Sequence, residues 1–135
     1  MHKAGFTLVE VAVVLAVSTL LVTLTVPSAL GALTKSRRSD AVNALTRVQL
    51  TQEQFRAQHG IYSANPRALI GAPLPRSDGG HYDITLQQVQ AERYQAWAVA
   101  RADSPQARDV ECQQITVTVN DGSAEFGPSL RCWNR

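Results

Sequence analysis

The feature that most constrains this chain is an apolar segment, Phe6–Val26, that carries a single charged side chain, Glu10. About 20 consecutive apolar residues in a helix are enough to cross the hydrocarbon layer of a membrane. An ionised carboxylate inside such a span costs roughly 2.5 to 3.5 kcal/mol. The segment is therefore predicted to be a membrane-spanning helix in which Glu10 is retained for a specific reason.

The apolar segment differs from an ordinary secretory signal in two respects. It is longer than the usual apolar core of roughly 7 to 15 residues, and its small and basic residues, in "HKAG", precede the core instead of following it. Cleavage by the ordinary signal enzyme near Ala29 or Ala32 is an alternative, although Glu10 would then interrupt the signal core.

The motif "GFTLVE" before a long apolar helix resembles the class III signal of type IV prepilins and of the pseudopilins of type II secretion. The resemblance covers about the first 60 residues. It implies that a membrane peptidase, the prepilin peptidase, cuts after Gly5 and methylates the new terminal amine of Phe6. It also implies that Thr7 and Glu10 act in assembly.

Elementary electrostatics gives Glu10 a role that agrees with this resemblance. If the chain is cut after Gly5, subunits stacked with an axial offset place Glu10 of one copy beside the Phe6 ammonium of another. In a medium of low dielectric constant, that attraction partly offsets the desolvation of both charges. The alternative is that Glu10 lies at the membrane interface, solvated by headgroups and without a partner.

A single long helix is predicted from Phe6 to about His59, kinked near Pro27, where a backbone donor is lost, and made more flexible by Gly31. Gly60 is a favourable residue to end it. In the second half, apolar residues recur at helical spacing and charged residues occupy the opposite face. The apolar positions are Leu30, Leu33, Ala41, Leu45, Val48 and Phe55, and the polar ones Lys35, Arg37, Arg38, Arg47, Glu53 and Arg56.

A small antiparallel sheet is predicted after this helix. Proline, glycine and serine between Asn65 and Gly80 indicate a long loop with at most one helical turn near Ala68. Three strands are then predicted within residues 81–88, 93–102 and 112–120, the first and third from alternating apolar residues and the second from an apolar and aromatic stretch. A fourth, at 123–127, follows the turn signal "NDG". The fold class is therefore α+β, with the long kinked helix packed on the sheet.

Four regions follow from these assignments. Residues 1–5 are the leader, 6–33 the transmembrane or filament-core half of the helix, 34–59 its amphipathic half, and 60–135 the globular head.

Cys112 and Cys132 are the two cysteines of the chain. Because the N-terminus indicates export, a disulfide is favoured over a metal site or a thiol nucleophile. It would close a loop of about 20 residues, worth roughly 3 kcal/mol.

The sequence contains no pattern typical of an enzyme or a cofactor site. His2, His59 and His81 lack metal-ligand spacing, and no phosphate-binding loop or nucleophile motif occurs. The acidic residues Asp103, Asp109, Glu111 and Asp121 are spread over separate turns and are expected to be solvated. We expect neither catalysis nor a cofactor nor a metal.

The C-terminal segment "LRCWNR" suggests a DNA contact. Arg131 and Arg135 flank Trp133, and arginine beside an exposed aromatic ring is a combination that binds nucleic acids. The alternative is that Trp133 packs beside the disulfide and that the arginines are solvated. The net charge of +2 does not by itself indicate a nucleic-acid partner.

The resemblance implies a minor pilin: a structural subunit held in the bacterial inner membrane as a precursor and then extracted into an extracellular filament that serves adhesion, twitching motility or DNA uptake. Its expected partners are other pilin subunits, the prepilin peptidase, the assembly platform and the lipid bilayer. A type II secretion pseudopilin is one alternative. A membrane-anchored periplasmic binding module is another, although an anchor alone needs neither Gly5 nor Glu10.

Overall fold

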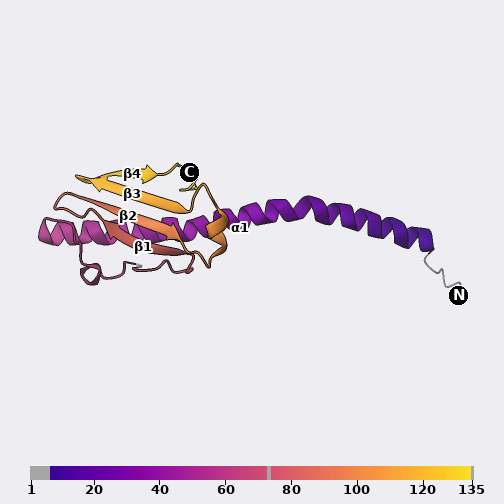
Figure 1. The fold of residues 1–135 in the computed structure, drawn as a ribbon, viewed down its shortest axis with the longest axis horizontal. Coiled ribbons are helices and arrows are strands. Elements are labelled where there is room, and N and C mark those ends of the chain that lie inside the picture. The colour runs from indigo at the N-terminus through magenta and orange to yellow at the C-terminus, as the bar shows by residue number, and fades with distance from the viewer. Residues whose placement is uncertain (1–6, 73, 135) are drawn as a thin grey trace. The chain divides into compact units, whose positions relative to one another are not determined.

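The structure, a computed structural model, describes residues 7–72 and 74–134, without the side chains of residues 23–28. The helix α1 (Leu8–His59) is followed by a four-stranded sheet (Figure 1), which confirms the predicted α+β class. One compact unit ends at Leu33 and the next begins at Thr34. The other elements are η1 (Pro66–Ala68), β1 (Tyr82–Gln87), β2 (Arg93–Ala100), η2 (Pro105–Arg108), β3 (Gln114–Asn120) and β4 (Ser123–Gly127).

The first unit contains the N-terminal half of α1, whose apolar side chains from Leu8 to Val17 are exposed to solvent. Among the residues with described side chains, no stretch of helix is both long and apolar enough to cross a membrane. The backbone is helical through Pro27 and Gly31. The side chain of Pro27 is not among those that the structure describes, so the predicted kink at this residue stays a prediction.

The start of α1 is capped by Thr7. Its Oγ1 accepts a hydrogen bond from the backbone N–H of Glu10, 3.2 Å away. Thr-x-x-Glu at a helix start is the sequence of a capping box, in which the threonine satisfies a backbone donor that the helix leaves unpaired. Thr7 and Glu10, predicted to act in assembly, therefore also share a local structural contact.

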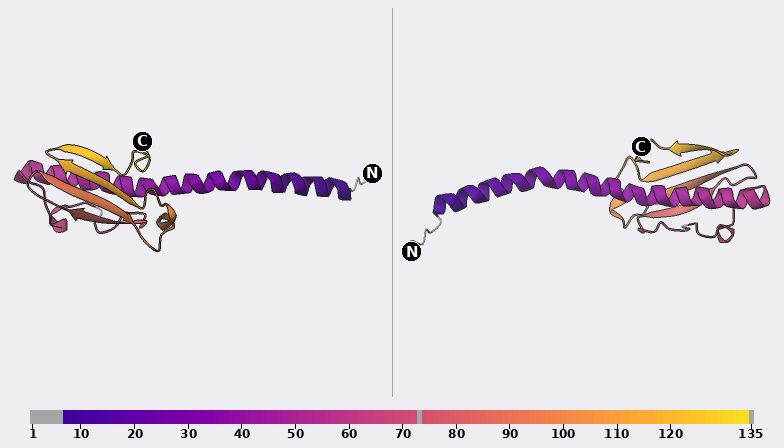
Figure 2. Two further views of the ribbon diagram at one scale, coloured as in Figure 1. Left: turned by 45° about the horizontal axis from the view of Figure 1, so that its top comes forward. Right: turned by 180° about the vertical axis from the view of Figure 1, so that it is seen from behind.

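The core of the second unit lies between the second half of α1 and one face of the sheet (Figures 1 and 2). Ala41, Ala44, Leu45 and Val48 recur at helical spacing, and each is at most 3% exposed. The sheet contributes alternate residues that point inward: Tyr82, Ile84, Tyr94, Ala96, Ala98, Ile115, Val117 and Val119. Leu33, predicted on the apolar face, is 49% exposed and lies outside this core.

All four predicted strands are present, in the order β1-β2-β3-β4, and each pairs antiparallel with its neighbours in the sequence. The tight turn predicted at "NDG" joins β3 to β4. Asp121 and Gly122 both have positive φ, 46° and 77°, as a two-residue hairpin turn that follows the twist of the strands requires.

The loop between α1 and β1 is held by side chains of the helix. Gly60 ends α1 at φ 77°, as predicted, and η1 is the single helical turn expected near Ala68. Asp40 accepts hydrogen bonds from Ser77 Oγ at 2.6 Å and Gly79 N at 2.8 Å. The helix therefore fixes the end of the loop that leads into β1.

Candidate nucleic-acid interface

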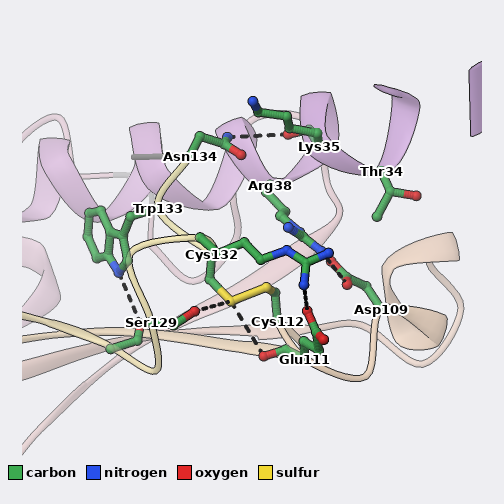
Figure 3. Close-up of a disulfide and its surroundings, with 12 residues drawn as sticks. Thr34, Lys35, Arg38, Asp109, Glu111, Cys112, Ser129, Cys132, Trp133 and Asn134 are labelled. Atoms are coloured by element: carbon green, nitrogen blue, oxygen red, sulfur yellow. Dashed lines mark hydrogen bonds and ion pairs between the residues drawn. A yellow bond between two sulfur atoms is a disulfide. The ribbon is translucent and has the colours of Figure 1, made fainter. Parts of the chain in front are cut away.

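The C-terminal loop is closed by the predicted disulfide. Cys112 and Cys132 are bonded with their Cα atoms 5.4 Å apart, and both side chains are buried (Figure 3). The bond joins the segment before β3 to the turn after β4, so it fixes the last part of the described chain against the sheet.

Trp133 is buried beside this disulfide, which makes the predicted DNA contact wrong at its central residue. Its side chain is 2% exposed, packs edge-on against Phe126 with the ring centroids 4.5 Å apart, and donates from Nε1 to the carbonyl of Gly127 at 3.0 Å. Burial of the indole with its N–H satisfied is favourable, and no ring face is left for stacking. The alternative considered for the sequence, packing beside the disulfide, is the arrangement found.

The two arginines that flank Trp133 give no support for a DNA contact at the C-terminal segment. Arg131 is exposed but lies 2.7 Å from the carboxylate of Glu111, so its charge is partly neutralised. Arg135 lies outside the described residues.

A buried ion pair fixes the loop between β2 and β3. Arg38 donates two hydrogen bonds of 2.7 Å, from Nε and Nη2, to the carboxylate of Asp109 (Figure 3), and the side chains are 10% and 7% exposed. The hydrogen bond to Asp109 raises the pKa of the Arg38 guanidinium, although burial opposes this. The sequence had placed Arg38 on the polar helix face and Asp109 among solvated acids. Both predictions are wrong, because the helix η2, which was not predicted, brings Asp109 against α1.

The buried amide of Gln106 extends this arrangement. Its Nε2 donates to Tyr82 Oη at 2.9 Å, and burial raises the pKa of that tyrosine. Together with the Arg38 ion pair, this bond ties η2 to both α1 and β1.

The face of the sheet that points away from α1 carries the side chains that could contact a ligand. No helix or strand of the described chain covers it (Figures 1 and 2). Because Tyr94, Ala96 and Ala98 point into the core, Trp97 points outward, and its neighbours across the strands are Thr85 and Thr116. The aromatic residue on the solvent side is therefore Trp97. Trp97 was not predicted as a functional residue, although the alternation of β2 in the sequence indicates that its side chain lies on the outer face.

A polar groove of about 260 Å³ lies on this face. Its lining includes Gln95, whose Oε1 accepts a hydrogen bond from Trp97 Nε1. Tyr94 and Val119 form part of its lining, and both are almost fully buried. The polar side chains that line it are Gln88, Arg93, Gln95, Thr118, Asn120, Ser123 and Glu125.

Arg93 differs from most of the described arginines of the chain in its electrostatic surroundings. Within the described chain, Arg37, Arg67, Arg93 and Arg108 form no ion pair. Of these, Arg93 lines the groove. The paired arginines are Arg38, Arg47, Arg56, Arg76, Arg101 and Arg131. The outer face of β2 therefore presents Trp97 and, four residues away, an arginine that pairs with no carboxylate of residues 7–72 or 74–134.

Comparison with known families adds two matches. The model of the "Type IV minor pilin ComP, DNA uptake sequence receptor" matches residues 27–116, which is well over half of the chain. The chain belongs to the ComP family of type IV minor pilins. The model of the "Prokaryotic N-terminal methylation motif" matches residues 1–26. No protein among those with curated descriptions matches.

Membership of the ComP family decides between the alternatives that the sequence left open. The chain is a minor pilin subunit of a type IV pilus, and neither a secretion pseudopilin nor an isolated binding module. The matched region includes the second half of α1, β1, β2 and Trp97, whereas Cys132 and Trp133 lie beyond it.

The residues predicted to act in processing and assembly lie before the first described residue or shortly after it. Gly5 and Phe6 are outside, and Glu10 is exposed in the first turns of α1. No group of three or more potential metal ligands occurs among the described residues of this ComP-family chain.

Proposed function

We propose that this minor pilin captures DNA on the solvent face of its sheet, with Trp97 and Arg93 as principal contacts. The observation that carries the proposal is their arrangement on β2. The indole faces outward, and four residues along the same face lies a guanidinium that forms no ion pair with any described residue. Four residues of strand span about 13 Å. An aromatic ring packs against bases or sugars while an arginine binds a phosphate or a base edge.

The family description supports DNA as the ligand, because it names a receptor for a DNA uptake sequence. The role proposed for the chain is one of assembly and binding, without catalysis. A receptor of this kind needs its binding face exposed on the filament, and the uncovered side of the sheet suits that requirement.

The proposed life cycle begins with a precursor in the bacterial inner membrane. The prepilin peptidase cuts it after Gly5 and methylates Phe6, and the assembly platform then transfers the subunit from the bilayer to the filament. The exposed apolar side chains from Leu8 to Val17 support burial of this half-helix against lipid and later against other pilin subunits. Glu10 would set the register by pairing with the Phe6 ammonium of a neighbouring subunit.

Two variants separate processing from assembly. Gly5→Leu is expected to leave an uncut precursor in the membrane fraction, because a bulky side chain would occupy the cleavage position. Glu10→Ala is expected to be trimmed normally but to enter sheared filaments several-fold less than the wild type. Mass spectrometry of the N-terminus and immunoblotting of filaments measure the two effects. Normal trimming of the first variant, or normal incorporation of the second, would contradict the corresponding assignment.

Replacement of Trp97 tests the DNA interface. Truncation of a tryptophan at the centre of an interface typically costs about 2 kcal/mol, so Trp97→Ala is expected to weaken binding of the full chain to a DNA duplex by roughly 30-fold. Fluorescence anisotropy in detergent, repeated at increasing salt, measures affinity and its salt dependence.

Val99→Ala is the matched control for Trp97→Ala. Val99 lies two residues further along the same outer face, is 39% exposed and carries no ring. Its replacement should leave the affinity within about twofold. Absence of salt-sensitive binding by the wild-type chain, or equal affinity of Trp97→Ala, would refute the proposed interface.

A further inference from the structure

The polar groove beside Trp97 holds two opposite charges that do not neutralise each other. Arg93 enters it from β2 and Glu125 from β4, with β3 between them. In the described part of the chain, neither forms an ion pair. By strand spacing and rise, their Cα atoms are about 12 Å apart. The groove therefore offers a strong donor on one side and a strong acceptor on the other.

The register places further polar groups between these two charges. Thr118 of β3 pairs with Gln95 on one side and Glu125 on the other, and Asn120 pairs with Arg93 and Ser123. These side chains all belong to the outer face of the sheet, so the charged groups and the amides form two adjacent rows across three strands. Such a surface can contact a flat ligand at several points at once.

Trp97 determines which end of the Gln95 amide is available. Its Nε1 lies 3.2 Å from Gln95 Oε1. Because an indole N–H can only donate, it holds the amide oxygen and leaves the amide NH2 group of Gln95 as a donor. Gln95 also lines the groove, so it adds a second donor to that of Arg93.

We infer that this groove reads base edges in the DNA major groove, and that Arg93 and Glu125 are specificity-determining residues that favour a G·C pair. The inference rests on the proposed DNA-capturing function. Guanine presents two acceptors, O6 and N7, to which arginine donates, and cytosine presents the N4 amino group, which a carboxylate accepts. A phosphate would be repelled by Glu125, so the groove suits a base pair better than the backbone.

A randomised pool of DNA duplexes is the probe that tests this inference. The full chain in detergent selects from the pool, and the bound fraction is sequenced for the wild type, Arg93→Lys and Glu125→Gln. A good base contact contributes roughly 5- to 150-fold discrimination. Arg93→Lys keeps the charge but loses the planar fork, so salt-dependent binding should persist while the preference for guanine falls at least fivefold. Glu125→Gln should bind the whole pool at least as tightly and lose its preference for cytosine.

Arg108→Lys is the matched control. Arg108 is likewise exposed and forms no ion pair within the described part of the chain, but it lies on η2, away from the groove. It should keep the wild-type base preference. Equal thermal midpoints would show that all variants are folded. Unchanged base preference in Arg93→Lys and Glu125→Gln, with binding intact, would overturn this inference and leave the proposed function standing. Absence of salt-sensitive binding by the wild-type chain would overturn both.

Discussion

Arg38→Ala is expected to destabilise the head by about 3 to 5 kcal/mol, because it leaves the carboxylate of Asp109 buried without a partner. This is a large part of the 5 to 15 kcal/mol that typically separates folded from unfolded domains. Urea unfolding of the full chain in detergent, followed by near-ultraviolet circular dichroism, measures the change. The double variant Arg38→Ala with Asp109→Ala should recover part of the loss, since it removes both charges.

The exposed ion pair between Arg47 and Asp78 provides the control for this prediction. Its atoms are 2.8 Å apart, close to the 2.7 Å of the buried pair, but the side chains are 45% and 71% exposed. Exposed pairs contribute about 0.2 to 1 kcal/mol, so Arg47→Ala should cost less than about 1 kcal/mol. Equal costs for Arg38→Ala and Arg47→Ala would show that burial of the first pair has no energetic consequence.

Removal of the disulfide is expected to cost about 3 kcal/mol. Cys112 and Cys132 are 20 residues apart, and the chain-entropy model gives a stabilisation of this size for such a loop. Cys112→Ser combined with Cys132→Ser should therefore lower the urea midpoint substantially. Since the pair also belongs to the buried core, the new hydroxyl groups would add a desolvation cost.

Reductant provides the internal control for the disulfide. It should lower the urea midpoint of the wild-type chain towards that of the double serine variant and leave the variant itself unchanged. A wild-type midpoint that does not respond to reductant, under conditions where thiol titration shows both cysteines free, would refute the expected stabilisation.

The strands β1 and β3 were predictable because each shows an alternation that local sequence contains in full. Tyr82 and Ile84 alternate with polar residues, and "NDG" specifies a two-residue turn. The end of α1 was equally local, since Gly60 supplies the left-handed conformation that ends a helix.

The ion pair of Arg38 with Asp109 was not predictable in the same way. Its partners are 71 residues apart, and a charged residue on a helix normally faces solvent. Nothing near Arg38 in the sequence indicates that a turn of 3-10 helix will cover it. Contacts between distant elements depend on packing, which patterns of a few residues do not contain.

The two tryptophans show how far a functional site could be predicted. Trp133 has arginine neighbours in the sequence, but its side chain is buried in the core together with the disulfide. Trp97 lies in an apolar stretch that suggests burial, although the inward alanines on either side place it outside. The correct choice required assigning each residue of β2 to a face of the sheet, which alternation alone would have allowed.

The order β1-β2-β3-β4 has a consequence for how the head folds. Each strand pairs only with the strand next to it in the chain, so the sheet has low contact order and its hairpins can form early and fast. The contacts of Ala41, Leu45 and Val48 with the sheet join residues that are farther apart in the chain, and closing longer loops costs more entropy. We therefore expect the slow step of folding to be the docking of α1 and not the pairing of strands.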